Sequence, residues 1–182
     1  MEVAYMPYLF TSESVSEGHP DKLCDMISDS ILDACLSLDP NARVAVEAMV
    51  KGTEEGSHIF IGGEVTIDSS DLIQFEEIAR ATASEVGYSD HSVGMDSTDP
   101  DSCETIVRIT QQSPEISQGV DEGSGLHLEQ GAGDQGLMFG YASNETEAFE
   151  ELMGMFMPLP AALAQRLTSA MTVAMKDGTL PW

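Results

Sequence analysis

The sequence predicts a protein of mixed α-helices and β-strands, and three stretches carry that prediction. Residues 20–38 repeat apolar side chains every three or four positions, which is the period of an amphipathic helix. Residues 43–51 alternate in the manner of a half-buried strand, and residues 58–67 indicate a second strand. Helix and strand patterns thus follow one another, so neither an all-helical nor an all-strand fold is expected.

The first helix is expected to begin at Pro20, because proline fits the first helical position, where no backbone N–H is needed. Its apolar face is formed by Leu23, Ile27, Ile31, Ala34 and Leu38. Aspartates repeat every four residues at Asp21, Asp25, Asp29 and Asp33. Most of this row indicates a solvated face, whereas Asp21 stands at the start of the helix beside His19.

The two strands are expected to form a hairpin around the loop 52–57. Glu47 lies on the opposite side of the first strand from its valines, and Gly62-Gly63, just before Glu64, indicates a bulge or a close backbone approach. A single carboxylate in a strand most simply faces water. Two on neighbouring strands favour a site for a cation or an ammonium group.

The rest of the chain predicts two more helices, over 71–86 and 160–176, and two more strands, over 104–112 and near 137–142. The last helix is expected to face inward through Leu163, Leu167, Ala170, Met171 and Ala174. Residues 113–125 are rich in glycine and polar side chains. A loop of that length is usually functional or disordered.

Charge excludes several partners. The chain has 7 Lys and Arg against 32 Asp and Glu, a net charge of −25, so we expect no nucleic acid and no anionic membrane as a partner. The acidity fits a solvated surface, as in a salt-rich cell, or a positively charged protein partner. The sequence shows no signal peptide and no run of 18 apolar residues, so a cytoplasmic protein is expected. The cysteines, which lack close pairing, are expected to be reduced thiols: Cys24, Cys35 and Cys103.

Residues 131–136, GAGDQG, match the spacing G-x-G-x-x-G of a dinucleotide-binding turn. That turn needs an apolar strand before it and a helix after it. Neither is predicted here, because the residues after the hexad favour a strand. The glycines are therefore expected to let the backbone approach another ligand, with Asp134 and Gln135 as the polar pair.

The segment 12–22 also combines groups that suit chemistry. His19 at a helix N-terminus lies where unpaired amides and the helix dipole favour an anion. Asp21 offers a hard oxygen ligand of the kind Mg²⁺ prefers. The residues alone are equally consistent with local helix capping.

The stretch 9–22, LFTSESVSEGHPDK, closely resembles the opening of the S-adenosylmethionine synthetase (methionine adenosyltransferase) family of bacterial and eukaryotic type. Further stretches resemble the same family in the same order: 43–51, 62–66, 112–116, 118–121, 129–142 and 178–182. The His-Pro-Asp-Lys opening and the GAGDQG hexad are highly specific together.

The resemblance implies an enzyme that joins L-methionine to ATP and releases pyrophosphate and phosphate, with Mg²⁺ and K⁺ as cofactors. His19 matches the catalytic, ATP-binding histidine that assists departure of the 5′-oxygen. Asp21 matches a Mg²⁺ ligand and Glu47 the carboxylate associated with K⁺. The methionine-binding positions match Glu64, Gln112 and Asp134, and a gating loop matches Ser113, Pro114, Gln118 and Gly119.

The resemblance also implies the fold class α+β, in repeated units of mixed sheet covered by helices, incomplete without the C-terminal half of the family. Its domains are expected as a partial N-terminal-type domain (1–17 and 143–182), a central-type domain (18–112), a mobile gating loop (113–128) and a strand carrying GAGDQG (129–142).

The chain departs from the family at 52–58, which is longer and acidic, and at 145–164. It also ends where family members continue for about as long again, with the lysines and arginines that hold the triphosphate. We therefore expect a synthetase subunit active only with a second polypeptide supplying that basic half, in a homodimer-like packing. The alternatives are a non-catalytic regulatory or structural subunit of a synthetase, and a truncated inactive fragment.

Overall fold

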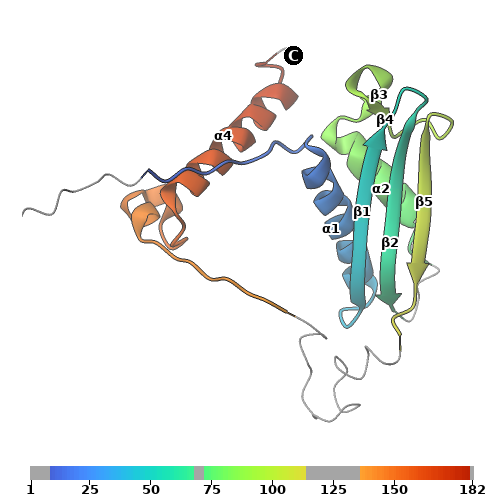
Figure 1. Cartoon of the computed structure of the whole chain (residues 1–182), viewed down its shortest axis with the longest axis horizontal. Coiled ribbons are helices and arrows are strands. Elements are labelled where there is room, and N and C mark those ends of the chain that lie inside the picture. The colour runs from blue at the N-terminus through green and yellow to red at the C-terminus, as the bar shows by residue number, and fades with distance from the viewer. Residues whose placement is uncertain (1–8, 68–71, 114–135, 181–182) are drawn as a thin grey trace, which may run out of the picture. The chain divides into compact units, whose positions relative to one another are not determined.

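The computed structural model describes residues 9–67, 72–113 and 136–180. The chain divides into two compact units, Gly18–Leu137 and the pair Met1–Glu17 with Met138–Trp182. Helices and a mixed sheet occur together, so the predicted α+β class is confirmed (Figure 1).

The unit Gly18–Leu137 is built on a three-stranded sheet in the order β1-β2-β5. β1 (Arg43–Gly52) and β2 (Ser57–Thr66) form an antiparallel hairpin, and β5 (Cys103–Thr110) pairs with β2 in parallel. A parallel neighbour needs a crossover connection. That connection contains α2 (Phe75–Val86), which returns the chain to the same end of the sheet.

Helices α1 (Pro20–Leu38) and α2 cover one face of this sheet, as Figure 1 shows. The core lies between the helices and the sheet and contains, among others, Leu23, Ile27, Ile31, Ile59, Ile61 and Ala79, all fully buried. Burying each leucine or isoleucine side chain contributes about 1.5–3 kcal/mol. The other face of the sheet has no helix over it among the described residues of this unit.

Arg80 of α2 ties the turn-rich segment after α2 to the sheet. Its guanidinium donates to the carbonyl oxygens of Ser97, at 3.1 Å, and Cys103, at 2.7 Å, and its Nε donates to Glu76 at 2.8 Å. The segment holds two short strands and a 3-10 turn: β3 (Ser89–Asp90), η2 (His91–Val93) and β4 (Met95–Asp96). The fully buried Ser97 hydroxyl completes the connection by donating to Tyr88 O.

The second unit contains two 3-10 turns, η3 (Glu145–Ala148) and η4 (Glu150–Leu152), and the helix α4 (Leu159–Lys176). Carboxylates organise this region. Glu145 accepts from the backbone N–H of Leu159 at 3.0 Å, where α4 begins, and Glu147 accepts from Gly154 N at 2.9 Å. Hydrogen bonds rather than a large core therefore hold its described part.

Most element predictions agree with the structure. The first helix spans the predicted residues, the hairpin strands differ from prediction by one residue at their ends, and β5 runs from 103 to 110 rather than 104 to 112. The second helix begins at Phe75 rather than at 71, which lies outside the described residues.

Two predictions are wrong where the structure describes them. No strand forms over 136–142, and the side chains of Leu137, Met138, Phe139 and Tyr141 are 80–92% exposed. The inward face predicted for α4 is also exposed, since Leu163, Leu167 and Met171 are 47–66% accessible. Both sequence patterns do mark apolar residues. A strand, however, also needs a neighbouring strand to hydrogen-bond with, and an apolar helix face is buried only where another element packs against it. The described residues provide neither.

None of the helices in the described ranges is both long enough and apolar enough to cross a bilayer.

A first prediction tests the core of the unit Gly18–Leu137. Ile27→Ala should lower the free energy of unfolding by roughly 2–5 kcal/mol, because it removes packed methyl groups and leaves a cavity under the sheet. Leu38→Ala, on the same helix but half exposed, is the matched control and should cost about 1 kcal/mol or less. Urea unfolding followed by circular dichroism measures both, and equal losses would contradict this account of the core.

Candidate functional site

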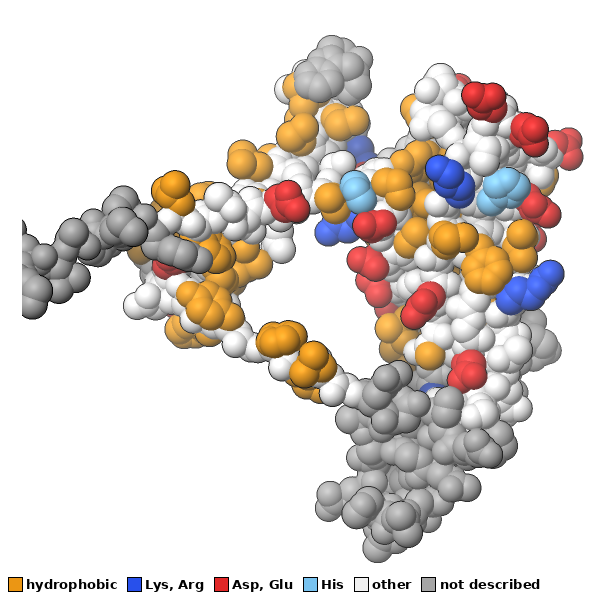
Figure 2. All heavy atoms as spheres, in the orientation of Figure 1, with side chains coloured by type: hydrophobic (Ala, Val, Ile, Leu, Met, Phe, Trp, Pro, Cys, Tyr) orange, Lys and Arg blue, Asp and Glu red, His pale blue; other side chains and the backbone are white. Residues whose placement is uncertain are grey.

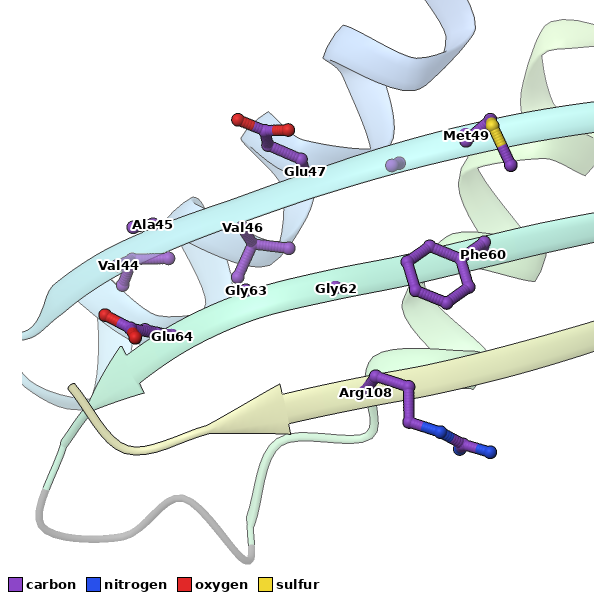
Figure 3. Close-up of a pocket in the computed structure, with 11 residues that line it drawn as sticks. Val44, Ala45, Val46, Glu47, Met49, Phe60, Gly62, Gly63, Glu64 and Arg108 are labelled. Carbon is purple, nitrogen blue, oxygen red and sulfur yellow. The ribbon is translucent and has the colours of Figure 1, made fainter. Parts of the chain in front are cut away.

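The uncovered face of the β1-β2-β5 sheet forms an open depression of about 900 Å³. Because side chains alternate along a strand, Val44 and Val46 point toward the helices while Glu47 and Met49 face the depression. Figure 3 shows this surface, with Glu47 on β1, Glu64 and Phe60 on β2, and Arg108 on β5. The site therefore follows from the same alternation that builds the core.

Two carboxylates lie on neighbouring strands of this face. Glu47 is opposite Gly62, and Glu64 is opposite Ala45 in the antiparallel register. Glu64 is half-buried, whereas Glu47 is exposed. A pair of acceptor-only groups in one depression is suited to an ammonium group or a cation.

Gly63 brings the two strands close at this point. Gly63 has φ 142°, and a Cβ built there would lie 2.0 Å from the carbonyl oxygen of Ala45. A Cβ on Gly62 would lie 2.7 Å from the ring of Phe60. The close backbone approach predicted for Gly62-Gly63 is confirmed, and it sets the position of the adjacent Glu64.

Gln112 lies just beyond the end of β5, at the same end of the sheet as Glu64. Glu64 pairs with Thr110, two residues before Gln112. The Gln112 side chain is held by Arg43, whose Nε donates to Oε1 at 3.1 Å. The sheet thus places Glu64 and Gln112, two of the predicted methionine-binding residues, at one end.

His19 is the N-cap of α1, and its Nδ1 accepts the backbone N–H of Asp21 at 3.1 Å. The capping interpretation of this polar cluster is therefore confirmed for Nδ1. A neutral histidine that accepts at Nδ1 carries its proton at Nε2. Tyr88 fixes the approach to the helix, because its hydroxyl donates to the carbonyl of Gly18. Nε2–H thus remains as a donor at the start of the helix.

Several predicted site residues lie outside the described residues, namely Pro114, Gln118, Gly119 and Asp134. The same holds for the hexad apart from Gly136. Ser113, the first residue of the predicted gating loop, is described and half-buried.

The described residues contain no group of three or more His, Cys, Asp or Glu side chains that could hold a metal ion. Asp21 and Glu47 therefore each offer carboxylate oxygen without a partner set of the usual six or more ligands. Mg²⁺ and K⁺ both bind oxygen, so each carboxylate is a suitable ligand. The described residues supply only part of a coordination shell.

The cysteines are free thiols, as predicted. Cys35 and Cys103 are buried in the core. The pKa of Cys24 is raised, mainly because the thiol is partly buried. The Asp21 and Asp25 carboxylates raise this pKa further, whereas a hydrogen bond with the Val50 backbone lowers it. A thiol with a raised pKa stays protonated near neutral pH and is a poor nucleophile.

Sequence reasoning missed Arg43 and Arg108. Arg43 contacts a residue 69 positions away, and no local pattern signals such a pair. Arg108 could have been found, because it is a charged residue on the outward side of a predicted strand. It pairs with Gly62, which also pairs with Glu47, so the row across the face runs from an acid to a base.

Comparisons with known proteins point to one family. A family model described as S-adenosylmethionine synthetase, N-terminal domain, matches residues 7–114, and one described as S-adenosylmethionine synthetase, central domain, matches residues 129–182. The S-adenosylmethionine synthase of Syntrophobacter fumaroxidans is 47% identical over 173 residues, and that of Brachyspira hyodysenteriae is 45% identical over 176. These alignments cover 95% and 93% of this chain but 40% and 41% of the relatives.

The two family models divide the chain along the sequence, whereas the compact units follow contacts in space. The family model for the N-terminal domain covers 7–114, which includes the whole segment expected from the sequence to be central-type, 18–112. The model carrying the central label covers 129–182, which includes the expected N-terminal-type segment 143–182. The family's N-terminal domain model thus matches the segment expected to be central-type, and its central domain model matches the segment 143–182 expected to be N-terminal-type.

A second prediction concerns the glycine that sets the site. Gly63→Ala should destabilise the hairpin by more than about 1–3 kcal/mol, because it combines a strained φ with a clash against Ala45 O. Gly87→Ala is the control, since Gly87 also has positive φ, 122°, but nothing lies within 4 Å of its added Cβ. Hydrogen exchange of the β1–β2 amides, with urea unfolding, compares the two. Equal costs would show that the close approach to Ala45 does not matter.

Proposed function

Because the chain belongs to the S-adenosylmethionine synthetase family, we propose that it is a subunit of a synthetase that forms S-adenosylmethionine, pyrophosphate and phosphate from ATP, L-methionine and water. One observation supports the proposal: within a chain that matches this family along its length, Glu47 and Glu64 share one face of the sheet, and Gln112 lies just beyond the end of β5, near the residue that pairs with Glu64. Both relatives are named S-adenosylmethionine synthase, which is the activity proposed here.

The methionine end of the reaction is proposed to lie at the end of the sheet where Glu64 and Gln112 stand. The Glu64 carboxylate would accept from the substrate ammonium, and the Gln112 amide would donate to the substrate carboxylate. Asp134 is assigned to the methionine site by the family resemblance alone. An ion pair of this kind strengthens when the site is closed to water.

The ATP end is proposed to lie at the start of α1, which packs beside Val50 at the opposite end of β1 from Arg43. The His19 that acts on a given methionine would therefore come from a second copy in the homodimer-like packing. The methionine sulfur attacks C5′ of ATP, the S–C5′ bond forms, and the C5′–O5′ bond breaks as the triphosphate leaves. The Nε2–H of His19 would donate to the departing 5′-oxygen, and the first-turn amides of α1 would favour the phosphate charge. Water then cleaves the triphosphate into pyrophosphate and phosphate.

Cations would complete this chemistry by offsetting the charge of the triphosphate. Asp21 would contribute one oxygen ligand to Mg²⁺, and Glu47 one to K⁺. Phosphate oxygens and protein groups outside the described residues would supply the others. Ser113, with Pro114, Gln118 and Gly119, would belong to the loop that gates the site.

A basic partner is the final part of the proposal. The chain spans about 40% of the length of the relatives it matches, and it has 7 Lys and Arg against 32 Asp and Glu. So acidic a chain holds few groups that could neutralise a triphosphate. We propose that a second polypeptide, corresponding to the C-terminal half of the family, supplies those cations in an assembly with homodimer-like packing.

Activity after complementation is the third prediction. The chain is mixed with a polypeptide corresponding to the remaining C-terminal part of the Syntrophobacter fumaroxidans synthase, and S-adenosylmethionine formed from ATP and L-methionine is measured by mass spectrometry. Product is expected only from the mixture. His19→Ala should lower the rate roughly 10²–10⁴-fold, the usual contribution of proton transfer by a positioned group. His91→Ala, at an exposed histidine of η2, is the matched control and should leave the rate unchanged.

Other outcomes decide between the alternatives. A folded complex without product would indicate an inactive fragment. A partner that is active by itself, in a complex insensitive to His19→Ala, would indicate a non-catalytic regulatory or structural subunit. If the mixture forms product and His19→Ala does not change the rate, the proposed synthetase activity stands and the proposed role of His19 is wrong.

A further inference from the structure

We infer that Arg43 is a positioning residue that fixes the orientation of the Gln112 side-chain amide, so that its NH₂ group faces outward as a donor. The inference rests on the proposed function for its catalytic meaning, because Gln112 is there a methionine-binding residue. The observation behind it is the hydrogen bond from Arg43 Nε to Gln112 Oε1, 3.1 Å long and partly buried.

The sheet explains how two residues 69 positions apart meet. Arg43 begins β1 and pairs with Thr66, the last residue of β2. β2 lies between β1 and β5, and Gln112 follows β5. The arginine side chain therefore crosses the end of β2. In agreement, the hydroxyl of Thr66 is buried and has no hydrogen-bond partner among the described residues.

The chemistry of the two groups fixes the amide. A guanidinium only donates, so the atom of Gln112 that faces Arg43 must be the carbonyl oxygen. The NH₂ group, on the opposite side of the amide carbon, is directed away from the arginine. Without this contact, oxygen and nitrogen could exchange places by a rotation about the last side-chain bond.

That orientation matters for an α-amino acid. Glu64 pairs with Thr110 close by and can only accept, which suits the ammonium group of the substrate. A carboxylate must then meet a donor, and Gln112 offers one only when its oxygen is engaged elsewhere. Arg43 would thus act through Gln112 without touching the substrate. It would keep the Gln112 carbonyl oxygen from facing the substrate carboxylate, where a second acceptor would repel it.

The first experiment reads the amide directly, and it does not require activity. The Gln112 side-chain NH₂ resonances of the ¹⁵N-labelled chain are assigned by their loss in Gln112→Ala, then compared between wild type and Arg43→Leu. We expect them to shift in Arg43→Leu. Lys51→Leu removes an exposed charge from the same strand, and we expect it to leave them in place. Unchanged resonances in folded Arg43→Leu would overturn the inference.

The second experiment, our fourth prediction, reads the consequence in the complemented synthetase. Arg43→Leu should raise KM for methionine roughly ten-fold, the scale of one hydrogen bond to a charged group. Its KM for ATP and its kcat should stay within about two-fold. Arg43→Lys keeps a donor toward Oε1 and should recover part of the loss, and Lys51→Leu should resemble wild type.

Two patterns would contradict a positioning role. One is an unchanged KM for methionine in Arg43→Leu. The other is a loss that adds to that of Gln112→Ala in the double variant, because residues acting through one contact should not be additive. If the wild-type mixture forms no product, the proposed function fails, while the amide resonances still decide whether Arg43 orients Gln112.

Discussion

The register between β1 and β2 is the constraint on which the rest of the structure depends. Side chains alternate along both strands, so a shift of either strand by one residue would turn its carboxylate, Glu47 or Glu64, toward the helices and move its buried apolar side chains outward. Burying an unpaired carboxylate is far more costly than exposing a few methyl groups. The hydrophobic core and the candidate site are therefore two results of one pairing, and neither can change alone.

Gly63 shows how closely this pairing is determined. Its backbone lies against Ala45 O at a separation that leaves no room for a Cβ, and its φ of 142° favours glycine. The next residue is Glu64, so the contact that secures the hairpin also determines where the carboxylate emerges. At the start of α1, the helix cap has a similar double effect. The hydrogen bond that satisfies the Asp21 amide also selects the tautomer of His19.

How much the sequence predicts depends on whether the deciding contact is local. The helix 20–38 and the hairpin follow from periodicity and from residues such as Pro20, and the structure confirms them. Periodicity also marked apolar faces at 137–142 and along α4, but what covers a face is not written in its own residues. The contact between Arg43 and Gln112 depends on strand order, which neither residue's neighbours encode. The site residues stay predictions that come mainly from the family resemblance, and their arrangement in space could not be predicted from the sequence.

Electrostatics suggests why the proposed activity would be shared between polypeptides. Glu47 and Glu64 stabilise positive charge in the depression, and the chain around them is strongly acidic. The same field opposes a triphosphate, since like charges repel more strongly where the local dielectric is low. Figure 2 shows acidic side chains spread over the visible surface and few basic ones among them. Under the proposed function, a chain of this composition would suit the cationic end of methionine and the developing sulfonium, and the anionic leaving group would need basic groups from elsewhere. The two demands oppose each other within one site, so separating them between an acidic and a basic subunit would satisfy both.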